Sequence, residues 1–160
     1  MTGNTETEIT QAGNVPVATT PSDTVRNFLD AMALADSVGA LELVHPDIEY
    51  ANVGYTFTRG KKPIAGLFRA MEKAHMGFGV KLLNISSDGS VVLTERVDEL
   101  SLGRFRMQFW VCGRFEVEDG LITVWRDYFD FVDTTKAFVR GLVGIAIPRI
   151  QKPLPKPAQR

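Results

Sequence analysis

Three charged side chains fall on two stretches that alternate in the manner of β-strands. The first stretch, "VVLTERVDEL" at 91–100, places Arg96 and Asp98 on one face, because successive side chains of a strand point to opposite faces. The second, "LITVWRDYFDF" at 121–131, places Asp127 in a row of aromatic side chains. A carboxylate is costly to bury unless it is paired, hydrogen-bonded or protonated. We therefore expect the arginine and the two aspartates to meet inside the protein.

An arginine between two carboxylic acids could perform acid/base chemistry. The planar guanidinium of Arg96 suits a bridge between Asp98 and Asp127. One positive and two potential negative charges are balanced when one acid stays protonated and the other ionised, and the two titrations are then coupled. Such a pair could deprotonate water while protonating an oxygen leaving group, for example that of an epoxide, without a metal. The alternative is a purely structural ion pair between Arg96 and Asp127, because such networks also occur without catalysis.

The loop between the last two predicted strands decides which way Asp127 points. A two-residue Asp-Gly loop would place Asp127 on the face opposite the apolar row of the preceding strand. A three-residue loop, 118–120, would pair Val117 with Leu121 and place Asp127 opposite Val111. Its last residue is a glycine, which suits the left-handed position that such a loop requires. We predict the three-residue loop, and therefore an aspartate that faces the interior.

Length and composition predict a single globular domain. The chain has 160 residues, 44% of them hydrophobic, and a net charge of −1, which favours neither nucleic acid nor an anionic membrane as a partner. A single cysteine, Cys112, excludes an internal disulfide, and we expect a cytoplasmic protein without a membrane-spanning segment. We assign residues 1–19 to a disordered N-terminal segment, 20–150 to the domain and 151–160 to a Pro-rich basic tail.

The order of the predicted elements indicates an α+β fold. Thr20, Pro21 and Asp23 have the pattern of a helix start, and Pro46 is expected to close a second helix. One curved sheet with helices on one face is the natural packing. The predicted helices begin at 21, cover about 37–44 and cover about 61–75, and the predicted strands are 78–86, 90–100, 104–117 and 121–131, after a short β-like stretch at 47–53.

Three motifs resemble those of the limonene-1,2-epoxide hydrolase family. They are "EYANVG", "LTERVDEL" and "GRFEVEDGLITVWRDYFDF", and the resemblance covers about residues 20–132 in the same order. It implies a cone-shaped, mixed sheet of about six strands of the nuclear-transport-factor-2-like type, with N-terminal helices packed on its concave side. It also implies a homodimer that hydrolyses epoxides in a single step without a cofactor.

The same resemblance implies roles for five residues. Asp98 matches the acid that protonates the epoxide oxygen, and Asp127 matches the base that activates a catalytic water. Arg96 matches the bridge between them. Tyr50 and Asn52, which share a strand face, match the residues that help to hold the water. Without the resemblance, these last two would read as an ordinary core tyrosine and a turn or edge residue.

A pocket of apolar side chains from helices and sheet would favour a hydrophobic substrate. Terpene, steroid and fatty-acyl epoxides all remain open as that substrate. Three uses also remain open for the apolar C-terminal stretch 134–155: covering the cone mouth, supporting a dimer or touching a membrane surface. The expected substrate-binding residues are Met32, Phe68, Met71, Leu100, Phe109, Val111, Trp125 and Phe129.

Two other functions are compatible with the same fold. One is a ketosteroid-isomerase-like or polyketide-cyclase-like enzyme, and the other is a non-catalytic protein that binds lipophilic ligands. His45 and His75 have no companion at metal-ligand spacing, and Cys112 lies on the strand face opposite the predicted site. We therefore expect no metal and no cysteine nucleophile.

Overall fold

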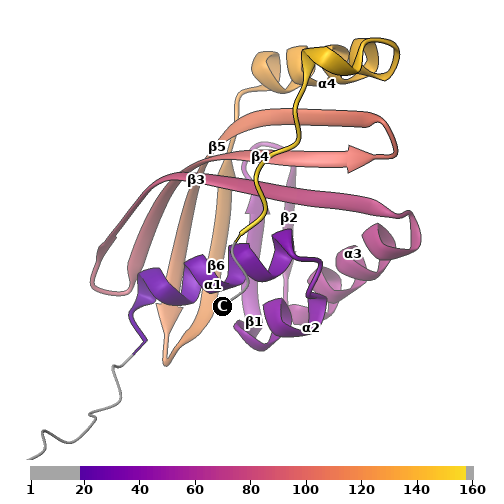
Figure 1. The fold of residues 1–160 in the computed structure, drawn as a ribbon. Coiled ribbons are helices and arrows are strands. Elements are labelled where there is room, and N and C mark those ends of the chain that lie inside the picture. Colours follow the sequence, from indigo (N-terminus) through magenta and orange to yellow (C-terminus); the bar gives the residue numbers. More distant parts are fainter. Residues whose placement is uncertain (1–18, 158–160) are drawn as a thin grey trace, which may run out of the picture.

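A curved six-stranded sheet with the strand order β2-β1-β6-β5-β4-β3 forms the centre of the molecule (Figure 1). The structure, a computed structural model, describes residues 19–157, so the predicted disordered segment lies almost wholly outside the described residues. The elements are α1 (Pro21–Ala33), α2 (Ser37–Glu42), β1 (Val44–Asn52), β2 (Thr56–Arg59), α3 (Lys61–Lys73), β3 (Met76–Asp88), β4 (Val91–Leu102), β5 (Phe105–Glu118), β6 (Leu121–Tyr128), α4 (Phe131–Ala146) and a short 3₁₀ turn, η1 (Pro148–Ile150).

The sheet is mixed. Strand β1 runs parallel to β6, whereas every other pair of neighbouring strands in the sheet is antiparallel. The parallel pair places Asn52 beside Asp127 and Tyr50 beside Trp125, although these residues are far apart in the sequence. The α+β prediction with a mixed, curved sheet is confirmed.

Helix α1 supplies much of the core on the concave side of the sheet. Its N-terminus has the predicted capping box, in which Thr20 accepts from the backbone N–H of Asp23. Val25, Phe28 and Leu29 are fully buried, as their helical spacing predicts. The ring of Phe28 packs edge-on against Trp125 at a centroid distance of 5.1 Å, which fixes one wall of the interior.

Two boundaries near the N-terminus differ from the sequence prediction. Helix α2 ends at Glu42, and Pro46 lies inside β1 rather than closing the helix. A proline is tolerated there because the pairing of β1 with β6 is interrupted between Val44 and Glu49, so the missing N–H breaks no ladder hydrogen bond. The short edge strand β2 was not predicted from the residues.

The β5–β6 hairpin has a two-residue turn, so the predicted three-residue loop is wrong. Asp119 and Gly120 both have positive φ, 49° and 78°, and Glu118 pairs with Leu121. A bulge then shifts the register, because Glu116 pairs with Val124 and leaves Thr123 as an extra residue.

This bulge reverses the effect of the shorter turn. Without it, Asp127 would lie opposite Cys112 and point to the convex face. With it, Asp127 lies opposite Gly113, not opposite Val111 as predicted, and it still points to the concave side. The predicted orientation is correct, but its structural cause was misidentified.

The C-terminal stretch forms α4, which covers the free edge of β5. Pairing with β6 stops at Cys112, so the first half of β5 lacks a strand on that side. Arg140 Nη2 donates to the carbonyl of Gln108 (2.8 Å), and Asp133 accepts from the backbone N–H of Trp110 (3.4 Å). These contacts satisfy edge groups that could otherwise pair with another chain. Closing a sheet edge was not among the three uses considered for this stretch.

Residues 151–157 cross the convex side of the sheet, where the yellow tail passes β5, β4 and β3 (Figure 1). Gln108 Nε2 donates to the carbonyl of Lys152 (2.7 Å), and the backbone N–H of Leu154 donates to Glu99 (3.2 Å). The described part of the Pro-rich tail, residues 151–157, is therefore anchored to the domain. No helix within residues 19–157 is long and apolar enough to cross a membrane.

The close approach of α4 to β5 requires the absence of a side chain at Gly141. A Cβ atom there would lie 2.5 Å from the carbonyl oxygen of Arg106 and 2.7 Å from the ring of Phe105. We predict that Gly141→Ala lowers the free energy of unfolding by about 1–3 kcal/mol, because the helix must move. The measurement is equilibrium denaturation.

Gly144→Ala on the same helix is the matched control. Its Cβ would meet only Gln151 at 3.5 Å, an ordinary contact, and alanine favours the helix by about 0.5–1 kcal/mol over glycine. We expect this variant to be at least as stable as the unmodified chain. Equal destabilisation by both substitutions would contradict the packing argument.

Candidate active site

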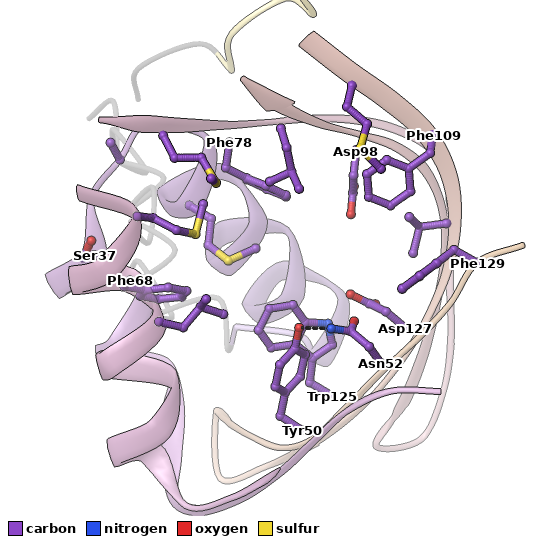
Figure 2. A pocket seen from close by; sticks show the side chains of 18 of the residues that line it. Ser37, Tyr50, Asn52, Phe68, Phe78, Asp98, Phe109, Trp125, Asp127 and Phe129 are labelled. Atoms are coloured by element: carbon purple, nitrogen blue, oxygen red, sulfur yellow. Dashed lines mark hydrogen bonds between the residues drawn. The ribbon is translucent and has the colours of Figure 1, made fainter. Parts of the chain in front are cut away.

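Arg96 joins Asp98 and Asp127 as the sequence predicted. Its Nε donates to Asp98 Oδ1 at 2.9 Å, and its Nη2 lies 2.7 Å from Asp127 Oδ1. Arg96 is fully buried, and each aspartate is only 5% exposed. Figure 2 shows both carboxylates pointing into the same hollow from neighbouring regions of the sheet. The two acids are therefore held at one place by a single cation.

Gly113 gives the arginine its path between strands. Thr94 on β4 pairs with Gly113 on β5, which in turn pairs with Asp127 on β6. A Cβ at Gly113 would clash with Arg96 Nη1 and with Thr94 Oγ1. The guanidinium thus occupies the space that a side chain would fill, and this lets it reach across β5 to Asp127.

The third nitrogen of the Arg96 guanidinium and one face of its plane also have contacts. Arg96 Nη1 donates to Thr94 Oγ1 (3.0 Å), and the hydroxyl of Thr94 is 3.4 Å from the carbonyl oxygen of Gly113. The guanidinium carbon lies 5.8 Å from the ring centroid of Phe115, within the range of a cation–π contact. The roles of Thr94 and Gly113 were not predicted, although Thr94 shares the strand face of Arg96.

Burial raises the pKa of Asp98 to about 6, since the interior disfavours its charged form. The nearby Arg96 opposes this shift, and the negative charge of Asp127 adds to it. Burial alone would lower the pKa of Arg96, but the two carboxylates outweigh it and raise that pKa above its ordinary value. The arginine therefore remains charged, while Asp98 is able to hold a proton under mildly acidic conditions.

Tyr50 and Asn52 reach the same site from β1. The parallel pairing with β6 places Asn52 directly beside Asp127. Asn52 Nδ2 donates to the hydroxyl oxygen of Tyr50 at 2.9 Å, the contact drawn as a dashed line in Figure 2. Burial and the charge of Asp127 raise the pKa of Tyr50 to about 12, so its hydroxyl keeps its proton. The ring of Tyr50 lies 4.2 Å from that of Trp125, centroid to centroid, which fixes its position.

These polar groups border a cavity of about 380 Å³. Its lining includes all eight residues that the sequence suggested as substrate contacts. Helical and strand spacing was sufficient to identify those eight. The lining residues that were not predicted are Ala35, Ser37, Leu67, Glu72, Met76, Phe78, Met107 and Thr134. Leu67, Phe78 and Met107 belong to apolar rows that the sequence displays, whereas Thr134 depends on α4, which was not predicted.

The other chemically active side chains lie elsewhere. His45, His75 and Cys112 do not line the cavity. Within residues 19–157, no group of three or more His, Cys, Asp or Glu side chains is arranged to hold a metal ion.

Comparisons with known proteins agree with this site. The sequence profile described as "Limonene-1,2-epoxide hydrolase catalytic domain" matches residues 19–140. The epoxide hydrolase EphG of Mycobacterium tuberculosis is 45% identical over 130 residues, which cover 81% of this chain and 87% of that protein.

Solved structures extend the comparison to the fold. An epoxide hydrolase of M. tuberculosis, described as similar to the limonene enzymes, superposes with a TM-score of 0.80 at 44% identity, over 84% of this chain and 95% of the other. A putative polyketide cyclase of Pseudomonas putida has a TM-score of 0.61 at 18% identity, over 74% and 98% of the two chains, and so shares the fold alone. With this profile match, this identity and a cavity bordered by the two aspartates that Arg96 joins, the chain belongs to the limonene-1,2-epoxide hydrolase family, a family of epoxide hydrolases.

Proposed function

We propose that this chain hydrolyses a hydrophobic epoxide to a vicinal diol in one concerted general acid/base step. The observation that carries the proposal is the position of Asp98 and Asp127. Both are buried, both contact Arg96 and both border one largely apolar cavity.

In the proposed step, Asp98 donates its proton to the epoxide oxygen as the ring C–O bond breaks. Asp127 takes a proton from a water molecule, whose oxygen forms the new C–O bond. Tyr50 and Asn52 would hold this water. Since Asn52 Nδ2 already donates to the tyrosine oxygen, the Tyr50 hydroxyl proton and the Asn52 carbonyl oxygen remain available to the water.

The arrangement keeps the buried charge constant during this step. One proton leaves Asp98 and one arrives at Asp127, so the trio with Arg96 holds one positive and one negative charge before and after the reaction. Creating a new unpaired charge in a buried site would be costly. The cation that contacts both acids therefore lowers the energetic cost of moving the negative charge from one acid to the other.

The substrate is proposed to be largely apolar, because the lining consists mainly of Met, Leu, Val and aromatic side chains. Terpene, steroid and fatty-acyl epoxides share this character. Isomerase and cyclase functions on the same fold are less well supported, since the polyketide cyclase likeness extends to the fold alone.

We also propose that the chain forms a homodimer through α4. The helix packs on β5 through small residues, Ala137, Gly141 and Gly144, and turns its large apolar side chains outward. Such a surface is typical of an interaction site. A second copy is the occupant that best suits it, in line with the dimer that the family resemblance implies. The outward residues of α4, each 42–66% exposed, are Phe131, Val132, Phe138, Val139, Leu142, Val143 and Ile145, and Ile147 and Ile150, which follow the helix, are similarly exposed.

Asp98→Asn and Asp127→Asn should each abolish hydrolysis while the protein stays folded, because each removes one of the two proton-transfer groups. Circular dichroism and diol formation from terpene, steroid and fatty-acid epoxides are the measurements. In a single turnover in ¹⁸O-labelled water, the label should enter the diol at once. Appreciable activity in either variant, or diol oxygen derived from the enzyme, would refute the proposed step.

The pH dependence follows from the raised pKa of Asp98. As the general acid, Asp98 is active in its protonated form, so kcat/KM should fall by about tenfold per pH unit above pH 6. The measurement is a pH profile of kcat/KM, with the doubly substituted Asp98→Asn, Asp127→Asn protein as the blank for spontaneous ring opening. A kcat/KM that rises with pH through this range would exclude Asp98 as the acid.

The dimer is tested by mass in solution. We expect a dimer by sedimentation equilibrium, and a monomer when Val139 and Leu142 are both replaced by aspartate, because charges would be buried in the interface. Val38, which is 71% exposed on α2, provides the control, since Val38→Asp should leave the dimer intact. A monomeric unmodified chain at micromolar concentration would contradict the proposal.

A further inference from the structure

The cavity has a second polar region, at the side opposite the catalytic trio. In Figure 2, Ser37 lies across the hollow from Asp98 and Asp127, with Phe68 on the same side as the serine. Glu72 also lines the cavity, and Ser37 Oγ donates a hydrogen bond to Glu72 Oε1. A mainly apolar pocket thus has polar groups at both ends.

Neither residue is required by the helix that carries it. Helix α2 is capped by Asp36, which accepts from the backbone N–H of Gly39, so the hydroxyl of Ser37 is not used for capping. Glu72 is in the last turn of α3, where the helix dipole disfavours a negative charge by about 0.3–1 kcal/mol. Local helix stability therefore does not explain why a serine and a glutamate stand here.

The pair also has unused hydrogen-bonding capacity. Among the described residues, the carboxylate of Glu72 receives a single hydrogen bond, from Ser37. The remaining polar lining residue outside the catalytic group, Thr134, already donates its hydroxyl to the carbonyl of Asp130 at 2.7 Å. The hydroxyl of Thr134 can therefore only accept a further hydrogen bond, and as a neutral group, whereas Glu72 offers a charged acceptor. Ser37 and Glu72 are thus the groups in this cavity best suited to recognise a substrate hydroxyl far from the reacting ring.

We propose that Ser37 and Glu72 form a subsite for a hydroxyl group at the end of the substrate remote from the epoxide. The substrate hydroxyl donates to the Glu72 carboxylate, while Ser37 keeps the carboxylate in place. The negative charge disfavours a substrate that carries a carboxylate at that end. The substrate class is then a neutral, apolar epoxy alcohol. This inference rests on the proposed function, because it assumes that the ring is opened at Asp98 and Asp127.

The test uses matched epoxides that differ at the remote end alone. Geraniol and farnesol, each epoxidised at the double bond farthest from the hydroxyl, are compared with their methyl ethers, which accept but do not donate a hydrogen bond. For at least one chain length, we expect kcat/KM to be about five- to tenfold higher for the alcohol, equivalent to one hydrogen bond to a charged group at a partly exposed site.

Three variants locate the effect. Glu72→Ala should bring the alcohol-to-ether ratio close to one, and Ser37→Ala should lower it part of the way. Lys73→Ala, the next residue on the same helix and absent from the cavity lining, should leave the ratio unchanged. Because the ratio is taken within each variant, a smaller folded fraction cancels. A purely structural link between α2 and α3 would change stability but not this ratio.

The carboxylic acid of the same skeleton provides a second readout. The unmodified chain should hydrolyse it less efficiently than the alcohol, and Glu72→Gln should narrow that difference, because the like charge is removed. A ratio near one at both chain lengths, or one that Glu72→Ala leaves unchanged, would overturn the subsite. If no epoxide is hydrolysed in a manner that depends on Asp98, the proposed function itself fails.

Discussion

A fully buried guanidinium that contacts two buried carboxylates is the interaction on which the rest of the site depends. Removing a charge from water costs several kcal/mol per ion unless partners replace the lost solvent. Here the partners of Arg96 are Asp98, Asp127, the hydroxyl of Thr94 and the ring of Phe115. The loss of either acid would leave the cation poorly compensated. Stability and the proposed acid/base function are therefore linked through the same contacts.

The sheet topology brings these groups together without a flexible loop. Thr94, Gly113, Asp127 and Asn52 pair in succession across β4, β5, β6 and β1. The last of these pairings is the parallel one between β6 and β1. Through it, a strand from the N-terminal half of the chain contributes to a site whose other paired residues come from the C-terminal half. Four hydrogen-bonded strands form a rigid support, and rigidity is what a positioned proton donor and acceptor require.

Much of the site could be predicted from the sequence, because strand alternation and helical spacing are local signals. They placed Arg96 and Asp98 on one strand face and identified all eight of the expected lining residues. The inward orientation of Asp127 was predicted correctly, but from a loop length that is wrong. The roles of Tyr50 and Asn52 came from the family resemblance, and the parallel β1–β6 pairing that brings them to Asp127 is a long-range feature.

The errors arose where tertiary context overrides a local signal. Pro46 reads as a helix stop, but it lies in an unpaired part of β1. The two-residue Asp119-Gly120 turn, taken alone, would place Asp127 on the convex face of the sheet. No residue type in the sequence predicts the bulge at Thr123, which returns Asp127 to the concave face. Helix α4 was missed because its small residues face β5 and its large apolar residues face outward, the reverse of the usual pattern for a surface helix.

The bulge at Thr123 gives this strand one residue more than regular pairing needs. Because Ile122 pairs with Val117 and Val124 pairs with Glu116, deleting Thr123 would join two residues whose partners are already consecutive, and Asp127 would stay opposite Gly113. In a hairpin of regular pairing, the loss of one residue would turn every later side chain to the other face. Here the loss of the bulge would absorb it, so descendants of this protein could shorten the strand by one residue without separating the two acids.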